Sequence, residues 1–367
     1  MTAEIVATYT GLVSDAGWAI GVDVGGTGIK AAVVDRASGT LVTSRRETPT
    51  PPGGTPADIV GVVARLVAEL ETEIADARRA MALGMAAPGG AAQAGVVVEA
   101  GAMAAEDAPL PPLPVGVAIP SVVRGGVALT AANIDPSWIG ADAGALFAAA
   151  IGRPVAVLND ADAAGVAEAR FGAAREAAGV TLLLTFGTGI GSALLHDGVL
   201  VPNLELGHLH LDGHADIERF ASAKVIEREG ISQAEWASRA ARLLQHLEVL
   251  FHPDRFVLGG GISAVAERYL PFPGVEAPVV PALCRADAGI VGAAASAMAE
   301  SGAESGAESG TERGAERADQ AGQAGQAGQA GRSGLPGIDH IGTIGLPGND
   351  RPGFDRGGPA GLEGERT

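Results

Sequence analysis

Two glycine-rich turns, each directly after an apolar strand-like run, constrain this chain more than any other feature. They occupy residues 20–30 and residues 182–191. Glycine lets a backbone turn tightly and bring its N–H groups close to a phosphate. Thr27 and Thr188 lie beside the glycines, and Lys30 follows the first turn. The pair of turns therefore predicts two loops that bind one phosphate chain from two sides.

The residues after the first turn indicate what kind of phosphate loop it is. Apart from Lys30, residues 29–34 are apolar, which predicts a second strand, whereas a dinucleotide-binding loop would open a helix. A Walker loop is excluded because residues 20–30 contain no Gly-Lys-Ser/Thr. A third strand is expected over residues 40–47. A phosphate-binding β-hairpin is typical of the actin-like ATPase and sugar-kinase architecture, and a plain glycine-rich hairpin is the alternative.

Composition excludes several classes of protein. The chain has 367 residues, of which 47% are hydrophobic, enough for two globular lobes. Cys284 is the only cysteine, so a disulfide within the chain and a cysteine-rich zinc site are excluded. The net charge of −18 opposes binding to nucleic acid. No apolar run approaches the roughly 20 residues of a membrane span, and no signal-peptide pattern is present, so we expect a cytoplasmic protein that binds no membrane.

Composition also divides the chain into segments. Residues 1–16 are expected to be a flexible leader, and the Ala/Gly/Pro-rich residues 80–113 an inserted flexible loop. The expected lobes are a small N-terminal one over residues 17–137 and a large C-terminal one over residues 138–299. Residues 300–367 are rich in small and polar repeats, which predicts a disordered low-complexity tail. Apolar periodicity and capping residues predict helices over residues 55–79, 142–151, 161–171, 232–250 and 289–299.

Asn159 and Asp160 follow a short apolar strand predicted over residues 155–158. A carboxylate at the end of a buried strand is well placed to accept the proton of a substrate hydroxyl while that hydroxyl attacks phosphorus. Aspartate is also a good N-cap, so Asp160 is either a general base or the cap of the next helix. Asp162 is close enough in sequence to be the cap instead.

A second polar cluster is Glu205-Leu-Gly-His208. Its acceptors and donors suit a polyhydroxylated ligand such as a sugar. Two alternatives remain open: a zinc site formed by His208, His210 and His214, and an ordinary polar surface strand. The turn at residues 259–261 follows another apolar strand and would let a nucleotide lie against the backbone, or is simply a strand-to-helix turn.

Together these segments resemble the ROK family of sugar kinases, and within it the polyphosphate glucokinase branch. The resemblance covers about residues 17–79 and 114–297. The strings at residues 130–140 and 158–165 are long enough to make it specific. The strings that carry the resemblance lie at residues 23–30, 130–140, 158–165, 184–192, 197–203, 205–209, 212–214, 235–236 and 258–263.

The resemblance implies an α/β protein of the actin-like ATPase (ribonuclease H-like) fold, with two α/β lobes and a central cleft. It implies a sugar kinase that moves a phosphoryl group from inorganic polyphosphate, and also from ATP, to the 6-hydroxyl of glucose. Asp160 would be the general base, and Asp23 would organise Mg²⁺ through water. Asp212-Gly-His214 replaces the family's cysteine-rich zinc loop, so no zinc is expected.

The resemblance also assigns binding residues. Those for the sugar are Asn159, Asp160, Glu205, His208 and Glu218. Those for the donor phosphates are Asp23, Gly25, Gly26, Thr27, Lys30, Gly187, Thr188, Gly189 and Gly191. Those for a nucleotide are Gly259, Gly260 and Gly261. The expected partners are glucose, polyphosphate and ATP, with neither nucleic acid nor membrane, and the chain is expected to form a homodimer.

Two other functions compete with this one. An ATP-only ROK hexokinase of other hexose specificity is the first. A non-catalytic sugar-binding regulator is more remote, because both glycine turns, Asp23 and Asp160 are present. A ROK repressor would carry a helix-turn-helix domain, and the residues before Trp18 show no such pattern.

An acidic chain that uses polyphosphate needs a local positive track. Lys224, Arg228, Arg239 and Arg242 lie on predicted helices after the sugar-like cluster and are candidates for it. The alternative is that they are solvated charges paired with neighbouring glutamates.

Overall fold

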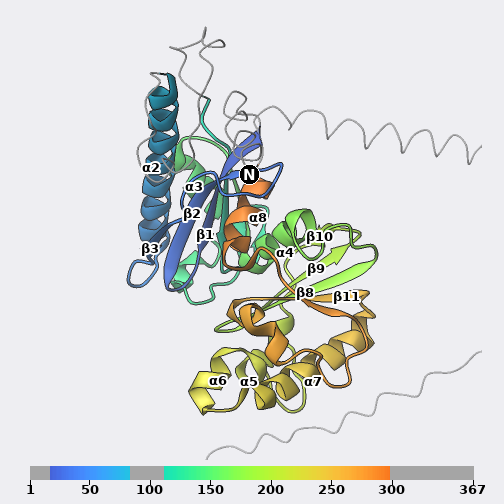
Figure 1. The fold of residues 1–367 in the computed structure, drawn as a ribbon. Coiled ribbons are helices and arrows are strands. Elements are labelled where there is room, and N and C mark those ends of the chain that lie inside the picture. Colours follow the sequence, from blue (N-terminus) through green and yellow to red (C-terminus); the bar gives the residue numbers. More distant parts are fainter. Residues whose placement is uncertain (1–16, 83–110, 298–367) are drawn as a thin grey trace, which may run out of the picture. The chain divides into compact units, whose positions relative to one another are not determined.

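The computed structural model describes residues 17–82 and 111–297, which all belong to one compact unit, Met1–Glu304 (Figure 1). The predicted leader, the predicted tail over residues 300–367 and nearly all of the predicted insert over residues 80–113 lie outside the described residues. The described part is built from two five-stranded sheets, a small hairpin and the helices packed on them.

The first sheet is built around the predicted glycine hairpin. Its strands run in the order β3-β2-β1-β4-β7, with β1 and β2 antiparallel and with β1, β4 and β7 parallel. Strand β2 follows the first glycine turn directly, which confirms the hairpin. The third strand starts later than predicted, because the Thr43 hydroxyl, and not a strand carbonyl, accepts the N–H of Val33. The strands are β1 (Trp18–Val24), β2 (Gly28–Asp35), β3 (Arg46–Pro49), β4 (Val115–Ile119) and β7 (Val155–Asn159).

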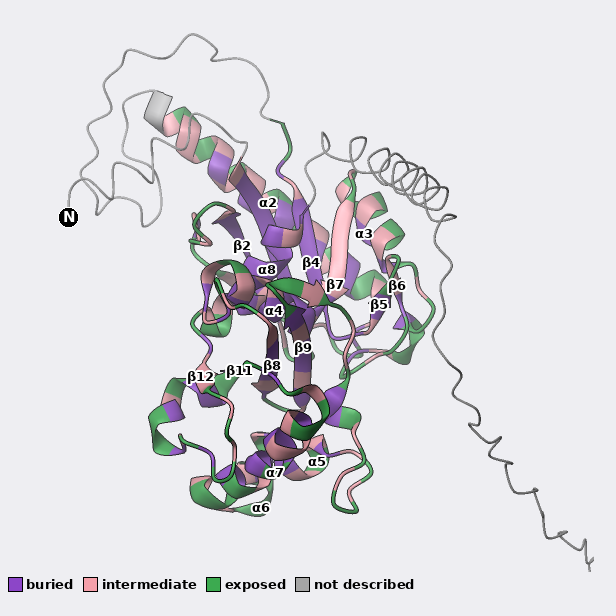
Figure 2. Ribbon diagram, turned by 90° about the vertical axis from the view of Figure 1, so that its right-hand side faces the viewer, coloured by how far each residue is buried: buried purple, intermediate pink, exposed green. Residues whose placement is uncertain are grey.

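The two faces of the first sheet differ in side-chain size, because side chains alternate along a strand. On β1, Ile20, Val22 and Val24 lie in a core shared with α2 and α3. The small Ala19 and Gly21 face α8 instead. Figure 2 shows the resulting band of buried residues along β2 and β4. Two predicted helices are confirmed here, α2 (Pro56–Ala82) and α3 (Ala143–Ile151).

The second sheet has the strand order β10-β9-β8-β11-β12 and is covered on one face by α7. Trp236 is fully buried in this core, and its indole N–H donates to the Ala221 carbonyl over 2.9 Å. The Ser232 hydroxyl accepts the N–H of Glu235 over 3.1 Å, which confirms the predicted N-cap. The elements are β8 (Val180–Phe186), β9 (Ile190–His196), β10 (Val199–Val201), β11 (Arg255–Gly259), β12 (Val279–Pro281), α5 (Glu218–Ala221), α6 (Lys224–Glu229) and α7 (Gln233–Phe251).

Two helices of small residues, α4 (Asp160–Phe171) and α8 (Ala288–Ser296), lie between the sheets (Figure 1). Helix α8 packs on β1, β2 and β4, α4 packs on β8 and β9, and the two helices pack on each other. This close approach needs glycine, because a Cβ on Gly116 would strike the carbonyl of Ala293 and one on Gly292 would strike that of Ala163. The packing brings the ends of β1 and β11 to the start of both helices.

The chain passes from the first sheet to the second after β7, so α3 and β7 belong with the first sheet. The predicted lobe boundary at residue 137 is therefore too early, because β7 pairs with the distant strand β4 and periodicity does not reveal that partner. The remaining elements are β5 (Val123–Arg124), β6 (Val127–Ala128), η4 (Pro136–Trp138), η5 (Leu206–His208), η6 (Gly261–Arg268) and η7 (Arg285–Asp287).

Candidate active site

The hairpin of β1 and β2 places Asp23 and Lys30 directly opposite each other. Their side chains form an ion pair with 3.8 Å between Lys30 Nζ and Asp23 Oδ2. Burial raises the pKa of Asp23, and the charge of Lys30 opposes that rise. The register of one hairpin thus holds an acid and a base side by side at the end of the first sheet.

Asp160 begins α4 at the point where β7 ends. The cap of α4 is Asn159, whose Oδ1 accepts the N–H groups of Ala161 at 2.8 Å and Asp162 at 3.1 Å. Asn159 Nδ2 donates to the Ser121 carbonyl over 3.2 Å, so this side chain is held on both sides. Asp160 Oδ1 also accepts from Ala161, and its Oδ2 has no hydrogen-bond partner among the described residues. The helix therefore does not need Asp160 as its cap.

Asp23, Lys30 and Asp160 line one cavity of about 490 Å³. Its other walls come from the end of β8, the turn after β11 and the segment that leads into α8. These walls include Thr185, Glu168, Gly259, Gly260, Gly261, Ser263, Arg285 and Gly289. The turn predicted to contact a nucleotide thus shares a cavity with the predicted base and the predicted magnesium residue.

Electrostatics single out Asp160 within this cavity. Burial raises its pKa to about 7, and the negative charges of Asp23 and Glu205 add to the rise. The hydrogen bond from the Ala161 N–H works in the opposite direction. A carboxylate with a pKa near neutrality accepts and releases protons readily at physiological pH, as a general base must.

The sugar-like cluster lies on η5 and just after it. His208 Nε2 is 3.8 Å from Glu205 Oε2, and His208 Nδ1 is 3.3 Å from Asp216 Oδ1. Burial raises the pKa of Glu205, the charge of His208 lowers it, and that of Glu218 raises it again. Glu218 Oε2 accepts the N–H of Ile190 over 3.1 Å, so it supports the second glycine turn. The sequence analysis did not single out Asp216, although an acid eight residues after a candidate histidine was visible.

The rest of the two glycine turns lies outside the walls of the cavity. The tips of both turns are exposed, and a Cβ on Gly26 would lie 2.6 Å from the Cβ of Asn133. The predicted residues that do not line the cavity are Gly25, Gly26, Thr27, Asn159, Gly187, Thr188, Gly189, Gly191, Glu205, His208 and Glu218. The structure thus brings Asp23, Lys30, Asp160 and the turn at residues 259–261 together in one cavity. Glu205 and His208 lie next to each other outside the walls of that cavity.

A set of hydrogen bonds that was not predicted from the sequence holds the chain just before Glu205. We call these hydrogen bonds, made by Asn203 and Asp162, the clasp. Asn203 Oδ1 accepts the N–H of Val123, and Asn203 Nδ2 donates to the Val123 carbonyl, each over 2.8 Å. Asp162 Oδ2 accepts the N–H of Asn203 over 2.9 Å, and burial raises the pKa of Asp162 to about 6. The clasp therefore ties β5 and α4 to the segment that carries the sugar-like cluster.

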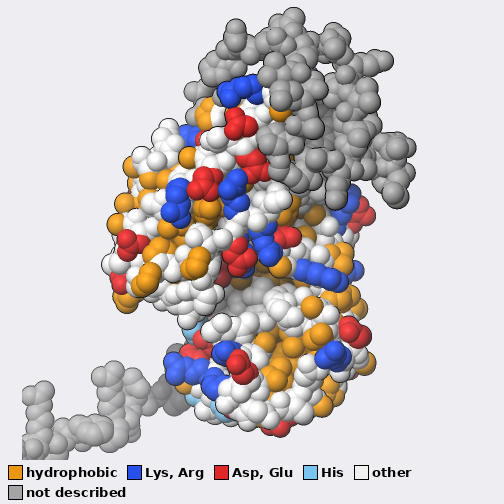
Figure 3. All heavy atoms as spheres, turned by 60° about the vertical axis from the view of Figure 1, so that its left-hand side comes forward, with side chains coloured by type: hydrophobic (Ala, Val, Ile, Leu, Met, Phe, Trp, Pro, Cys, Tyr) orange, Lys and Arg blue, Asp and Glu red, His pale blue; other side chains and the backbone are white. Residues whose placement is uncertain are grey.

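The four cations proposed for a positive track are all paired with acids. Arg239 contacts Glu229 and Glu235, at 2.6 and 2.9 Å. The other three pairs are Lys224 with Glu227, Arg228 with Glu229, and Arg242 with Asp212. In Figure 3, too, positive and negative side chains lie side by side over the face shown, without a patch of one sign. Lys224, Arg228 and Arg239 thus have the glutamate partners that the alternative expected, whereas Arg242 pairs with an aspartate from another segment.

The zinc alternative finds no ligand set in the described part of the chain. Among those residues, no group of three or more His, Cys, Asp or Glu side chains is arranged to hold a metal ion. His214 instead stacks on Phe220, with 4.0 Å between the ring centroids. As for membranes, none of the helices within residues 17–82 and 111–297 is both long and apolar enough to span one.

Comparison with known proteins agrees with the motifs. The family model described as "ROK family" matches residues 19–113 and 112–223. A polyphosphate glucokinase from Mycobacterium tuberculosis (strain CDC 1551 / Oshkosh) is 40% identical over 280 residues, which are 76% of this chain and 91% of the relative. The chain belongs to the ROK family. A further ROK relative, a polyphosphate glucokinase from Mycobacterium leprae (strain TN), is 39% identical over 280 residues, 76% of this chain and 74% of the relative.

Solved ROK structures have the same fold. An inorganic polyphosphate/ATP-glucomannokinase from Arthrobacter sp. strain KM is 45% identical, with a TM-score of 0.63, and covers 76% of this chain and 97% of its own. A ROK family glucokinase from Streptomyces griseus, solved in complex with glucose and AMPPNP, is 25% identical, with a TM-score of 0.54. The match covers 77% of this chain and 99% of the glucokinase chain. The fold of this ROK chain is thus the actin-like ATPase fold, as predicted.

Proposed function

We propose that this chain is a sugar kinase that transfers a phosphoryl group from inorganic polyphosphate, and from ATP, to the 6-hydroxyl of glucose. The names of its mycobacterial and Arthrobacter relatives support the donor and the acceptor. The observation that carries the proposal is Asp160, a carboxylate with a pKa raised to about 7 in a cavity that also holds Asp23 and Lys30.

Asp160 acts as the general base in this proposal. The oxygen of the sugar 6-hydroxyl attacks the terminal phosphorus of the donor and forms a new P–O bond. The bond from that phosphorus to the bridging oxygen breaks, and the shortened polyphosphate or ADP leaves with the electron pair. The hydroxyl proton passes to the unpartnered Oδ2 of Asp160. The raised pKa makes this carboxylate a stronger base than an ordinary aspartate, while much of it is still ionised at neutral pH.

The other predicted residues bind and orient the two substrates. Lys30 and the backbone N–H groups of the glycine turns hold the donor phosphates. Glu205 and His208 hydrogen-bond the sugar hydroxyls, and the contact of His208 Nδ1 with Asp216 Oδ1 sets the orientation of the imidazole. Asn159 acts less directly, because its contacts with α4 and the Ser121 carbonyl fix the backbone of Asp160.

The residues of the cavity fit a magnesium ion. Asp23 and Asp160 line the same cavity, and the charge of Asp23 raises the pKa of Asp160, so a cation bound in this cavity would offset the repulsion between the two carboxylates. Carboxylate oxygens and water are the ligands that Mg²⁺ prefers. Asp23 would hold the ion through water. When bound, the ion supplies positive charge that offsets the negative charge on the phosphate oxygens.

An assay of glucose 6-phosphate formation with polyphosphate, ATP and GTP as donors tests the proposal. We expect turnover with polyphosphate and with ATP. The ATP-only alternative is favoured by one observation, the pairing of all four cations of the predicted track. Turnover with ATP alone would establish that alternative. Glucose binding without turnover from any donor would instead identify a non-catalytic sugar-binding protein.

A further inference from the structure

Arg285 is an unpaired cation on the wall of the cavity that contains Asp23 and Asp160. Its side chain is exposed and makes neither an ion pair nor a hydrogen bond with any residue in the described part of the chain. Lys30, which lines the same cavity, already lies 3.8 Å from Asp23. Arg285 is therefore the side chain there whose charge is not already matched by an acid.

The backbone at Arg285 has an unusual conformation. Its φ of 49° lies in the left-handed region, which residues other than glycine and asparagine rarely adopt. Such a conformation persists only where the surrounding structure imposes it, and it is found more often at functional sites. The residue with this conformation is also the unpaired cation of the cavity.

Glu168 imposes this conformation from inside α4. Its side chain is fully buried, and its carboxylate accepts the N–H groups of Leu283 at 3.1 Å and Cys284 at 2.7 Å, immediately before Arg285. On the other side, Asp287 pairs with Arg45 at 3.0 Å. A buried carboxylate that accepts several backbone N–H groups fixes a loop firmly. The arginine is thus presented by a segment held at both ends.

We propose that Arg285 binds the phosphate groups of the donor that are not transferred, and that Glu168 positions it. The proposal rests on the proposed function, since it needs a donor with several phosphates. Asp160 is partly buried and must meet the terminal phosphate, whereas Arg285 is an exposed residue of the same cavity, so in this proposal it meets the phosphates further along the donor. A guanidinium donates two parallel hydrogen bonds to phosphate oxygens, so it suits this task.

The test compares Arg285→Ala with Arg268→Ala. Arg268 is an exposed arginine at the end of η6 that does not line the cavity, so its loss removes the same charge from the surface. Calorimetry measures tripolyphosphate binding without glucose, and kinetics give the KM for long polyphosphate and for glucose. In Arg285→Ala we expect roughly tenfold weaker tripolyphosphate binding and a polyphosphate KM raised as much, with the glucose KM within about twofold. Arg268→Ala should match the wild type in all three.

Two further variants separate charge from geometry. Arg285→Lys keeps the positive charge but loses the two parallel N–H donors of the guanidinium, so it should recover only part of the donor affinity. Glu168→Gln keeps the shape of the side chain but weakens its hydrogen bonds to the loop, so it should raise the polyphosphate KM while the glucose KM stays near that of the wild type. Equal donor binding by Arg285→Ala and Arg268→Ala would overturn the proposal.

The failure of this inference and that of the proposed function remain distinguishable. If the wild type transferred no phosphoryl group from any donor, the proposed function would fall. Weaker tripolyphosphate binding by Arg285→Ala than by Arg268→Ala would still support the phosphate site in that case. If the wild type were active and Arg285→Ala bound and used polyphosphate normally, the proposed kinase activity would be supported and the proposed role of Arg285 would be wrong.

Discussion

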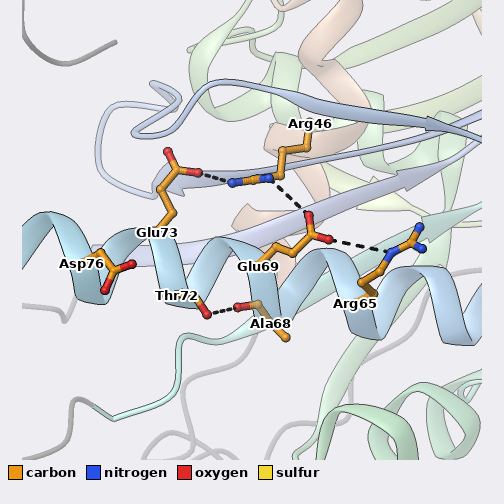
Figure 4. Close-up of a pocket in the computed structure, with 7 residues that line it drawn as sticks. All are labelled: Arg46, Arg65, Ala68, Glu69, Thr72, Glu73 and Asp76. Atoms are coloured by element: carbon orange, nitrogen blue, oxygen red, sulfur yellow. Dashed lines mark hydrogen bonds and ion pairs between the residues drawn. The ribbon is translucent and has the colours of Figure 1, made fainter. Parts of the chain in front are cut away.

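Two pockets of similar size carry their charges in opposite ways. The pocket on α2, about 420 Å³, holds Arg46 between Glu69 at 3.2 Å and Glu73 at 2.7 Å (Figure 4). The cavity at the start of α4, about 490 Å³, holds Asp160, whose pKa is raised, and Arg285. The charged side chains of the α2 pocket all have ion-pair partners, whereas in the α4 cavity Asp160 and Arg285 have none among the described residues.

The difference shows that volume alone does not identify a site. Matched charges have little to gain from a ligand, because each already has a partner across a short distance. The carboxylates in the α4 cavity are partly desolvated and repel each other, so a substrate or a cation that matches their charge is favoured there.

Asp160→Asn should lower the turnover number for glucose phosphorylation by about 10²- to 10⁴-fold, because the amide cannot accept the hydroxyl proton. Glucose binding, measured by calorimetry, should remain. Glu73→Gln makes the same chemical change in the α2 pocket and should leave turnover within about twofold of the wild type. Near wild-type turnover in Asp160→Asn would contradict the role of Asp160 as the general base, and the two pockets would then not differ in their effect on turnover.

The activity should also depend on pH through Asp160. Since the base must be ionised and its pKa is about 7, kcat/KM for glucose should fall about tenfold for each pH unit below 7 and level off above it. The raised pKa means that folding disfavours the ionised form, so the stability present below the ordinary aspartate pKa is lost as the pH rises through about 7.

Asp160→Asn lacks this loss of stability. Its melting temperature relative to the wild type should therefore increase from pH 4 to pH 8. A constant difference across that range would contradict the raised pKa, and Glu73→Gln provides the comparison from the other pocket.

Asp216→Asn should raise the KM for glucose about threefold to tenfold with a smaller change in kcat, because His208 loses a charged acceptor at 3.3 Å. Arg219→Gln is the matched control, since Arg219 is the other partner of Asp216, at 3.1 Å, and its loss leaves the contact with His208 in place. An equal rise in KM in both variants would show that Asp216 acts only through its pair with Arg219.

Glu73→Gln should change the protein least. It removes one of the two partners of a partly exposed arginine, so the free energy of unfolding should fall by less than about 1 kcal/mol in a denaturant titration. A larger loss, or a clear drop in turnover, would mean that the charges of the α2 pocket matter as much as those of the cavity.

Local sequence was sufficient for the features that arise from neighbouring residues. The glycine turn and the small apolar run after it predict the β1–β2 hairpin, whose register places Asp23 opposite Lys30. The apolar spacing predicts α2, and Ser232 predicts the start of α7. These predictions succeed because hairpins, caps and amphipathic helices depend on residues a few positions apart.

Other predictions were wrong or incomplete because their partners are distant in sequence. The lobe boundary was misplaced because β7 pairs with β4, about 40 positions earlier in the chain. The charges of Arg239 and Arg242 were left open, and the structure pairs Arg242 with Asp212, thirty positions earlier. The contacts from Glu168 to the loop before Arg285 bridge more than a hundred positions.

The family, the fold and the acid that follows β7 could be predicted from the sequence, because motifs and periodicity depend on consecutive residues. Which charges have partners depends instead on tertiary contacts. Whether a carboxylate keeps its ordinary pKa depends on burial and on the charges that folding brings near it, as Asp23 and Glu205 are brought near Asp160. The same folding leaves Arg285 without an acid among the described residues and gives Arg46 two.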